Sequence, residues 1–194
     1  MGWEPLSRHG PWHQPARDPT LARMKAPRLL DCVVLEPPKR ATACVIWLHG
    51  LGANGHDFPP VVPMLGLPKD HSIRFRFPHA PSIPVTINGG MVMPAWYDIL
   101  SMESIREVDE AGVRQSAAQL QALVDQEIEA GIPSERIILA GFSQGGAIAL
   151  HQGLRAERPL GGLMLLSTYQ ACDGNLDEER SQANASVPIF QAHG

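Results

Sequence analysis

Five consecutive residues, Gly141-Phe142-Ser143-Gln144-Gly145, have the types and spacing of a nucleophilic serine on a sharp turn. They follow the apolar run Ile137-Ile138-Leu139-Ala140 and precede small residues at helical spacing, which predicts a strand, a turn and a helix. A serine on such a turn projects toward a substrate carbonyl, and glycine two residues before and after it leaves room for the crossing chain. The pattern favours nucleophilic attack by the Ser143 hydroxyl.

Two backbone N–H groups are expected to bind the oxygen that becomes negative during this attack. The helix after Ser143 directs its free N–H groups toward that oxygen, so the N–H of Gln144 is one candidate donor. The second comes from the loop 49–55, whose three glycines let an N–H near Leu51 face the same pocket. We expect His49 to orient this loop by hydrogen bonding, not to act as a base. Each segment taken alone also fits an ordinary tight turn.

Length and composition indicate one globular domain. The chain has 194 residues, of which 44% are hydrophobic and 19% charged, enough for one sizeable core. A net charge of -4 gives no reason to expect nucleic acid or an anionic membrane as partner. The three cysteines are widely spaced, which indicates neither a disulfide framework nor a metal site. No stretch resembles a membrane span or a signal peptide, so a cytoplasmic enzyme is expected.

The apolar runs predict an α/β fold, a mostly parallel sheet with helices on both faces. In such a sheet ligands bind at the carboxyl ends of the strands, where His49, His79, Ser143 and His193 are expected to lie. Residues 1–23, rich in proline and without periodicity, are predicted to be an irregular tail, and 24–194 to be the domain. The other predicted elements are strands at 29–36, 43–48, 73–77, 162–167 and 187–192 and a helix at about 104–130.

The connection at 83–97 is unusually apolar for a loop. Asn88-Gly89-Gly90 within it predicts a hairpin turn. Because loops normally face water, this segment either packs on the core or lines a pocket for an apolar ligand, and the sequence favours neither.

Four ordered motifs resemble the phospholipase/carboxylesterase family, which includes bacterial carboxylesterases and acyl-protein thioesterases. The resemblance implies an α/β-hydrolase that uses no metal or organic cofactor and cleaves carboxylic ester or thioester bonds of acyl chains through an acyl-enzyme on Ser143. It also implies an oxyanion hole made by the N–H groups of Leu51 and Gln144 and an acyl site bordered by Trp96. Small acyl esters, lysophospholipids and acylated proteins all fit as substrates. The motifs are Val45-Ile46-Trp47-Leu48-His49-Gly50-Leu51-Gly52, Phe77-Pro78-His79-Ala80-Pro81, Trp96-Tyr97-Asp98 and Gly141-Phe142-Ser143-Gln144-Gly145-Gly146-Ala147.

The resemblance also implies that two members of the catalytic triad are missing. In the family the acid follows the His-Gly that closes the penultimate strand, and the base comes later; here that pair is His193-Gly194. We therefore expect a C-terminally truncated fragment that lacks the last strand and helix and exposes a sheet edge. His151, about 12 Å along the helix from Ser143, and the terminal His193 are not expected to replace the base. The alternative function is a catalytically dead fragment or acyl-binding remnant.

Overall fold

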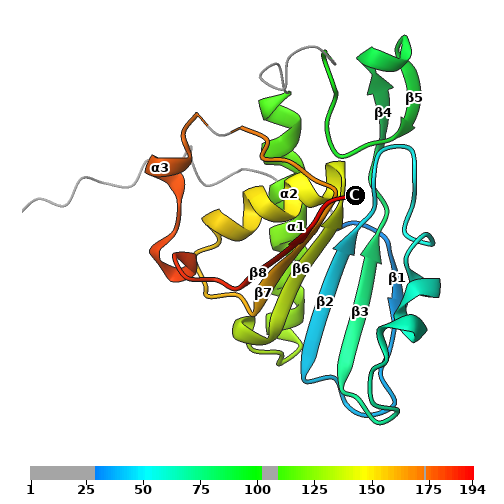
Figure 1. The fold of residues 1–194 in the computed structure, drawn as a ribbon, viewed down its shortest axis with the longest axis vertical. Helices are drawn as coiled ribbons and strands as arrows, with labels where there is room; N and C mark the ends of the chain where they lie inside the picture. The colour runs from blue at the N-terminus through cyan, green and yellow to red at the C-terminus, as the bar shows by residue number, and fades with distance from the viewer. Residues whose placement is uncertain (1–28, 102–108, 173) are drawn as a thin grey trace, which may run out of the picture.

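The structure, a computed structural model, describes residues 29–101, 109–172 and 174–194. The predicted tail at 1–23, its boundary with the domain and the start of the predicted helix at 104 lie outside these residues. A six-stranded sheet forms the centre of the molecule, and only β1 runs antiparallel to its neighbour (Figure 1). In spatial order the strands are β1 (Cys32–Leu35), β3 (Ile73–Pro78), β2 (Ala43–Leu48), β6 (Ile137–Phe142), β7 (Gly162–Leu166) and β8 (Ile189–Ala192).

The parallel register brings the carboxyl ends of the central strands to one edge of the sheet. Leu48 of β2 lies opposite Gly141 of β6, and Phe142 of β6 lies opposite Leu166 of β7. The arrowheads of these strands point the same way in Figure 1. The segments that follow them are therefore neighbours in space, as the sequence predicted.

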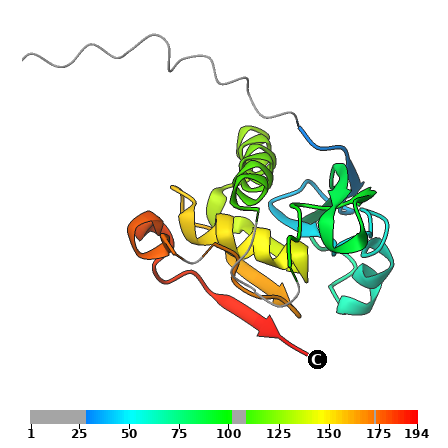
Figure 2. The same ribbon diagram turned by 90° about the horizontal axis from the view of Figure 1, so that it is seen from above.

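Both faces of the sheet are covered by helix, but by helices of different kinds. The α-helices α1 (Glu110–Glu129) and α2 (Gln144–Arg155) pack on the face that presents Ile46 and Leu48. The opposite face, with Val45 and Trp47, is covered by the 3-10 helix η2 (Pro59–Leu65) and the residues around it. Figure 2 shows α1 and α2 on the side of the sheet away from η2. Successive side chains of β2 point to opposite faces of the sheet, and both sets are apolar, as in a strand buried on both faces.

The predicted hairpin is present and extends from the edge where the site residues gather. Strands β4 (Ser82–Val85) and β5 (Met91–Pro94) pair antiparallel, and Gly89 and Gly90 adopt positive φ in the turn. Met91 and Val92 are exposed, whereas the following residues 95–97 are buried in the core. The apolar connection thus has an exposed tip and a buried base. The short 3-10 helix η3 (Thr86–Asn88) lies between the two strands.

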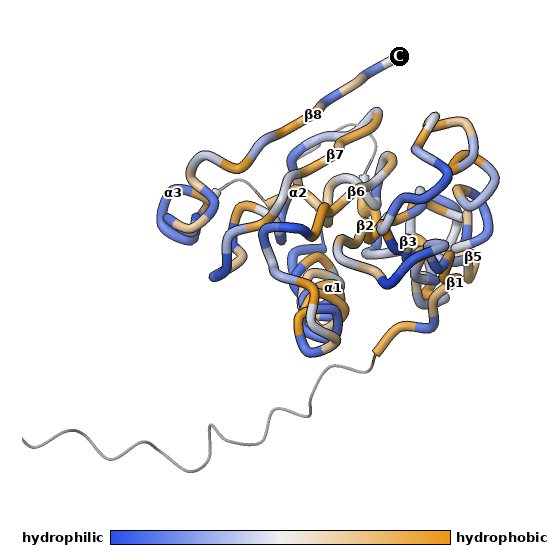
Figure 3. The backbone as a smooth tube through the Cα atoms, turned by 90° about the horizontal axis from the view of Figure 1, so that it is seen from below, coloured by the Kyte–Doolittle hydropathy of each residue, from blue (hydrophilic) through white to orange (hydrophobic). Residues whose placement is uncertain are grey.

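β8 is the outermost strand on its side of the sheet. It pairs with β7, and its Ile189 and Phe190 are 48% and 61% exposed. Figure 3 shows hydrophobic colour on β8, followed by more hydrophilic residues toward the C-terminus. β8 therefore forms an open edge of the sheet, and the predicted loss of a further strand and helix stays a prediction. The remaining short helices are η4 (Ser134–Arg136), α3 (Leu176–Glu179) and η5 (Gln182–Asn184). In the described part of the chain, no helix combines the length and hydropathy needed to cross a membrane.

Candidate active site

Ser143 occupies the sharp turn between β6 and α2. Its backbone has φ 51° and ψ -119°, a conformation that side chains rarely adopt and that surrounding contacts must maintain. The Ser143 N–H donates to the Leu166 carbonyl (2.9 Å), and the Ser143 carbonyl accepts from the Thr168 hydroxyl (2.6 Å) and the Ala147 N–H (3.1 Å). The end of β7 and the first turn of α2 therefore hold the serine in the strained conformation.

The glycine spacing around Ser143 has a direct steric cause. A Cβ at Gly141 would lie 2.4 Å from the carbonyl of Gly145, and one at Gly145 would lie 2.4 Å from the His49 carbonyl oxygen. Each position therefore accepts only glycine without backbone movement. The second contact also shows that the start of α2 packs directly against the loop that follows β2.

That loop turns back over the end of β2 and lies beside Ser143. A Cβ at Gly50 would be 3.6 Å from the Cβ of Ser143. Farther along, the Gly52 N–H donates to the Pro94 carbonyl (2.8 Å), and the Gly55 N–H donates to Nδ1 of His79 (3.1 Å). The structure thus brings the two predicted oxyanion segments together and anchors the loop to the hairpin and to the end of β3.

The two predicted oxyanion donors have free backbone N–H groups within the described residues. Leu51 makes no hydrogen bond there. Gln144 is the first residue of α2, where a backbone N–H has no partner inside the helix. Their oxyanion role itself stays a prediction.

His49 orients the loop, as predicted from the sequence. Its Nε2 accepts from the Ala80 N–H (3.1 Å), so the ring proton is on Nδ1, which donates to the Gly50 carbonyl (2.7 Å). The side chain is buried, and this burial lowers its pKa. Both ring nitrogens are engaged, so neither is available to take a proton from Ser143.

The side chain of Gln144 joins the start of α2 to the segment after β5. Its Oε1 accepts from the Trp96 N–H (2.9 Å), and its Nε2 donates to the Tyr97 carbonyl (2.8 Å). The Trp96 indole N–H donates to the His49 carbonyl (2.8 Å). Trp96 is only 2% exposed, so it lies within the wall of the site. Its predicted contact with substrate stays a prediction.

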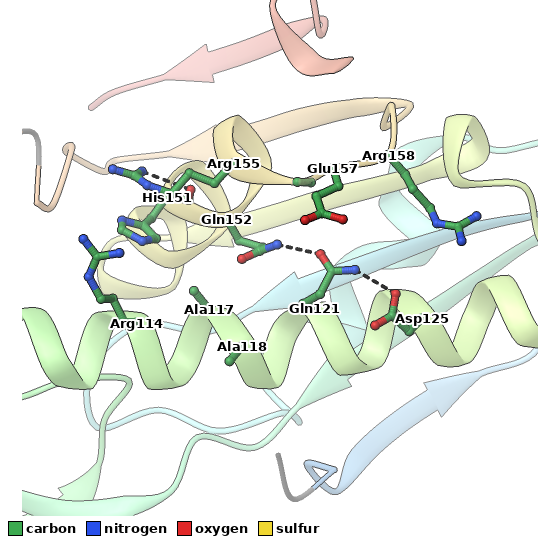
Figure 4. Close-up of a pocket in the computed structure, with 11 residues that line it drawn as sticks. Arg114, Ala117, Ala118, Gln121, Asp125, His151, Gln152, Arg155, Glu157 and Arg158 are labelled. Carbon is green, nitrogen blue, oxygen red and sulfur yellow. Dashed lines mark hydrogen bonds between the residues drawn. The ribbon is translucent and has the colours of Figure 1, made fainter. Parts of the chain in front are cut away.

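The two histidines considered as replacement bases do not contact Ser143. His151 lines a groove of about 590 Å³ between α1 and α2, eight residues along the helix from the serine (Figure 4). Burial and then the charge of Arg155 lower its pKa to about 4. His193 is exposed after β8. In the described ranges no histidine forms a hydrogen bond with the Ser143 hydroxyl.

Sequence reasoning assigned no role to two residues that lie beside Ser143. The Thr168 hydroxyl bonds to Ser143, and a Cβ at Gly146 would lie 2.7 Å from the Cβ of Thr168. Thr168 follows the carboxyl end of β7, and that position was the available signal. Phe142 is 40% exposed beside the serine, and its ring lies 6.2 Å from that of Phe58.

A mostly parallel sheet, a strained serine between a strand and a helix, and a glycine loop from the adjacent strand together define an α/β-hydrolase of the serine type. The chain belongs to the phospholipase/carboxylesterase family, whose match covers residues 30–194. The predicted family and fold class are therefore confirmed.

Relatives with known names and structures agree with this assignment. Acyl-protein thioesterase 1 of Neurospora crassa is 42% identical over 163 residues, covering 80% of this chain and 66% of that protein. The Cryptococcus neoformans protein of the same name is 38% identical over 171 residues, covering 87% of this chain and 71% of that protein. The crystal structure of Arabidopsis thaliana SOBER1 has a TM-score of 0.73 at 31% identity, and the match covers 80% of this chain and 74% of that one. The crystal structure of Zea mays acyl-protein thioesterase 2 has a TM-score of 0.70 at 28% identity, and the match covers 84% of this chain and 75% of that one. The match to the Neurospora protein thus spans less than two thirds of its length.

Proposed function

We propose that the protein hydrolyses carboxylic ester or thioester bonds of acyl chains through an acyl-enzyme on Ser143. The observation that carries the proposal is the Ser143 backbone at φ 51° and ψ -119°, held by Leu166 and Thr168. Strain of this kind costs on the order of 1–3 kcal/mol and clusters at active sites. Neither the core nor the sheet requires it, whereas a serine that must reach a carbonyl does.

The reaction proceeds in two steps. The Ser143 oxygen attacks the carbonyl carbon, and the resulting oxyanion accepts hydrogen bonds from the N–H groups of Leu51 and Gln144. The acyl–oxygen or acyl–sulfur bond then breaks, and the alcohol or thiol leaves with the proton that Ser143 gave up. Water hydrolyses the acyl-enzyme and restores the hydroxyl. A base must carry these protons, and the positions of His49 and His151 assign that role to neither.

The proposed substrates are acyl thioesters of proteins, with small acyl esters and lysophospholipids as alternatives. The two fungal relatives are named acyl-protein thioesterases, which supports the first class. Met91, Val92 and Phe142 expose apolar surface that suits an acyl chain. We further propose a cytoplasmic location, which is supported by Cys32, Cys44 and Cys172, all free thiols.

The test is labelling with a fluorophosphonate probe. We expect the wild-type protein to be labelled at Ser143 and Ser143→Ala not to be labelled, with the modified peptide identified by mass spectrometry. Ser167→Ala is the matched control, because Ser167 also has positive φ (45°) and directly follows the adjacent strand β7, yet lies outside the turn. Label that persists in Ser143→Ala would refute the assignment.

The alternative function is acyl binding without turnover. It is favoured by the absence of a hydrogen-bonded base on the Ser143 hydroxyl among the described residues. A serine without its base retains only about 10³–10⁴-fold acceleration over water. Saturable binding of a fatty acid by a wild-type protein that the probe does not label would establish this alternative.

A further inference from the structure

The two expected oxyanion donors belong to separate segments of the chain. Leu51 lies in the loop after β2, and Gln144 lies at the start of α2, which follows β6. Stabilisation of an oxyanion needs both N–H groups placed to within about 0.5 Å. The strands fix where the segments begin, but a further contact is needed to fix the loop against the helix.

Trp96 contacts both segments. Its backbone N–H donates to the side chain of Gln144 (2.9 Å), and its indole N–H donates to the carbonyl of His49 (2.8 Å), two residues before Leu51. Its own carbonyl accepts from the hydroxyl of Ser116 on α1. Trp96, Gln144, His49 and Ser116 are each at most 2% exposed. Buried hydrogen bonds of this kind hold their partners firmly because water cannot replace them.

The His49 carbonyl is the point at which the loop meets the helix. This oxygen would lie 2.4 Å from a Cβ at Gly145, so it packs directly on the first turn of α2. If the indole N–H is removed, the carbonyl loses this hydrogen-bond donor and must turn to find another. Leu51, two residues farther along the chain, would move with it.

We propose that Trp96 is a positioning residue that sets the placement of the Leu51 N–H relative to the Gln144 N–H. The inference rests on the proposed function of Ser143, because it gives Trp96 a role in forming the oxyanion hole. Trp96 acts through His49 and through the Gln144 side chain, and it does not itself touch the reacting atoms.

Trp47 provides a matched control for the volume that is lost when tryptophan is replaced. Trp47 is also buried, at 3% exposed, and its indole N–H has no partner in the described part of the protein. Trp96→Phe and Trp47→Phe therefore both shrink a buried ring, but only the first removes an indole hydrogen bond. A purely structural role of Trp96 predicts similar behaviour of the two variants.

The first measurement is the rate at which a fluorophosphonate modifies Ser143 in the full 194-residue protein. We expect Trp96→Phe to slow the maximal modification rate by about tenfold, as one buried hydrogen bond implies. The probe concentration at half-maximal rate should stay unchanged, and Trp47→Phe should stay within about twofold of wild type. Equal rates for the two variants would overturn the proposal.

The second measurement does not depend on reactivity. In hydrogen exchange followed by mass spectrometry, Trp96→Phe should raise the exchange of peptides covering 49–55 by about tenfold more than Trp47→Phe does. Peptides from the middle of α1 should change equally in both variants. A uniform increase in both would overturn the positioning role. If the wild-type protein does not react with the probe, the proposed function fails, and the exchange comparison still decides the role of Trp96.

A further variant tests the proposal if Trp96→Phe does not fold. Gln144→Met keeps the backbone N–H that faces the oxyanion but removes both side-chain hydrogen bonds to the Trp96 segment. Gln119→Met is its control, because Gln119 is 9% exposed and its Oε1 has no partner in the residues described. We expect the first to slow Ser143 modification by about tenfold and the second to leave it unchanged. Unchanged modification in Gln144→Met would contradict the proposal.

Discussion

Ser143 reaches its strained conformation because the residues around it have no side chains in the way. Gly145 is tightly constrained by another segment of the chain, since a Cβ there would meet the His49 carbonyl oxygen at 2.4 Å and the Leu48 carbonyl oxygen at 2.7 Å. Both contacts are to backbone, and β2 is held by hydrogen bonds to strands on either side. The clash can therefore be relieved only by moving α2 away from the sheet.

The expected consequence is that Gly145→Ala destabilises the protein by on the order of 3 kcal/mol or more, as overpacking against backbone does. Gly174→Ala is the control, because a Cβ there meets nothing within 4 Å, and it should stay within about 0.5 kcal/mol of wild type. Urea unfolding followed by tryptophan fluorescence measures both. Equal midpoints for the two variants would mean that α2 can shift freely and that the glycine spacing has another cause.

At the scale of elements, α1 is tied to the sheet by a buried carboxylate as well as by apolar packing. Glu127, 3% exposed, pairs with Arg74 and Arg76 of β3 at 2.8 Å each. The side chains of the two arginines are partly buried, at 22% and 11% exposed. Removing the shared carboxylate would leave Arg76 without a carboxylate partner among the described residues, and Arg74 with only its pair to the more exposed Glu36 (3.1 Å).

We therefore expect Glu127→Ala to lower the free energy of unfolding by about 3–5 kcal/mol, because it breaks a buried ion pair on one side only. The exposed pair between Lys39 and Asp70 provides the comparison. Asp70→Asn should leave the denaturation midpoint unchanged, since solvent screens such pairs. Guanidinium chloride titrations of both variants test this, and a similar loss in each would show that burial is not what gives the Glu127 pairs their strength.

The elements themselves were largely readable from the sequence. The predicted strand at 43–48 coincides with β2, and the predicted hairpin turn lies between β4 and β5. The predicted strand at 187–192 begins two residues later than expected, at Ile189, after Pro188, which has no N–H to donate. The antiparallel direction of β1 was not predicted, because apolar periodicity does not say which way a neighbouring strand runs.

The site was predictable only as far as local pattern determines it. Ser143 and its glycines follow from one turn, so the sequence placed them correctly. The burial of Trp96 and the side-chain hydrogen bonds of Gln144 depend on segments 47 or 48 residues apart in the chain. The hydroxyl of Thr168 likewise comes from another strand end. Such contacts arise from tertiary packing, and no local motif encodes them.

At the scale of the whole molecule, the groove between α1 and α2 makes stability depend on pH. His151 is 4% exposed there, and its Nδ1 has no partner in the ranges described. Burial first, and then the charge of Arg155, lower its pKa to about 4, although a backbone hydrogen bond at Ala171 and the carboxylate of Glu179 oppose the shift. The folded protein therefore resists protonation of a group that the unfolded chain protonates near pH 6.5.

Because the unfolded state binds the proton first, the free energy of unfolding should fall as the pH is lowered from about 6.5 through about 4, by at most about 3 kcal/mol from His151. His49, whose pKa burial also lowers, adds to the same slope.

His151→Leu should reduce the slope of stability against pH without abolishing it. Gln152→Leu, an uncharged change in the same groove, should leave the slope as in wild type. Urea unfolding at intervals between pH 7 and pH 4 measures these slopes. An undiminished slope in His151→Leu would overturn this assignment and leave His49 as the source. Glu179 cannot account for the slope, because Arg114 and Arg155 lower its pKa to about 2 and its contribution is lost mainly below pH 4.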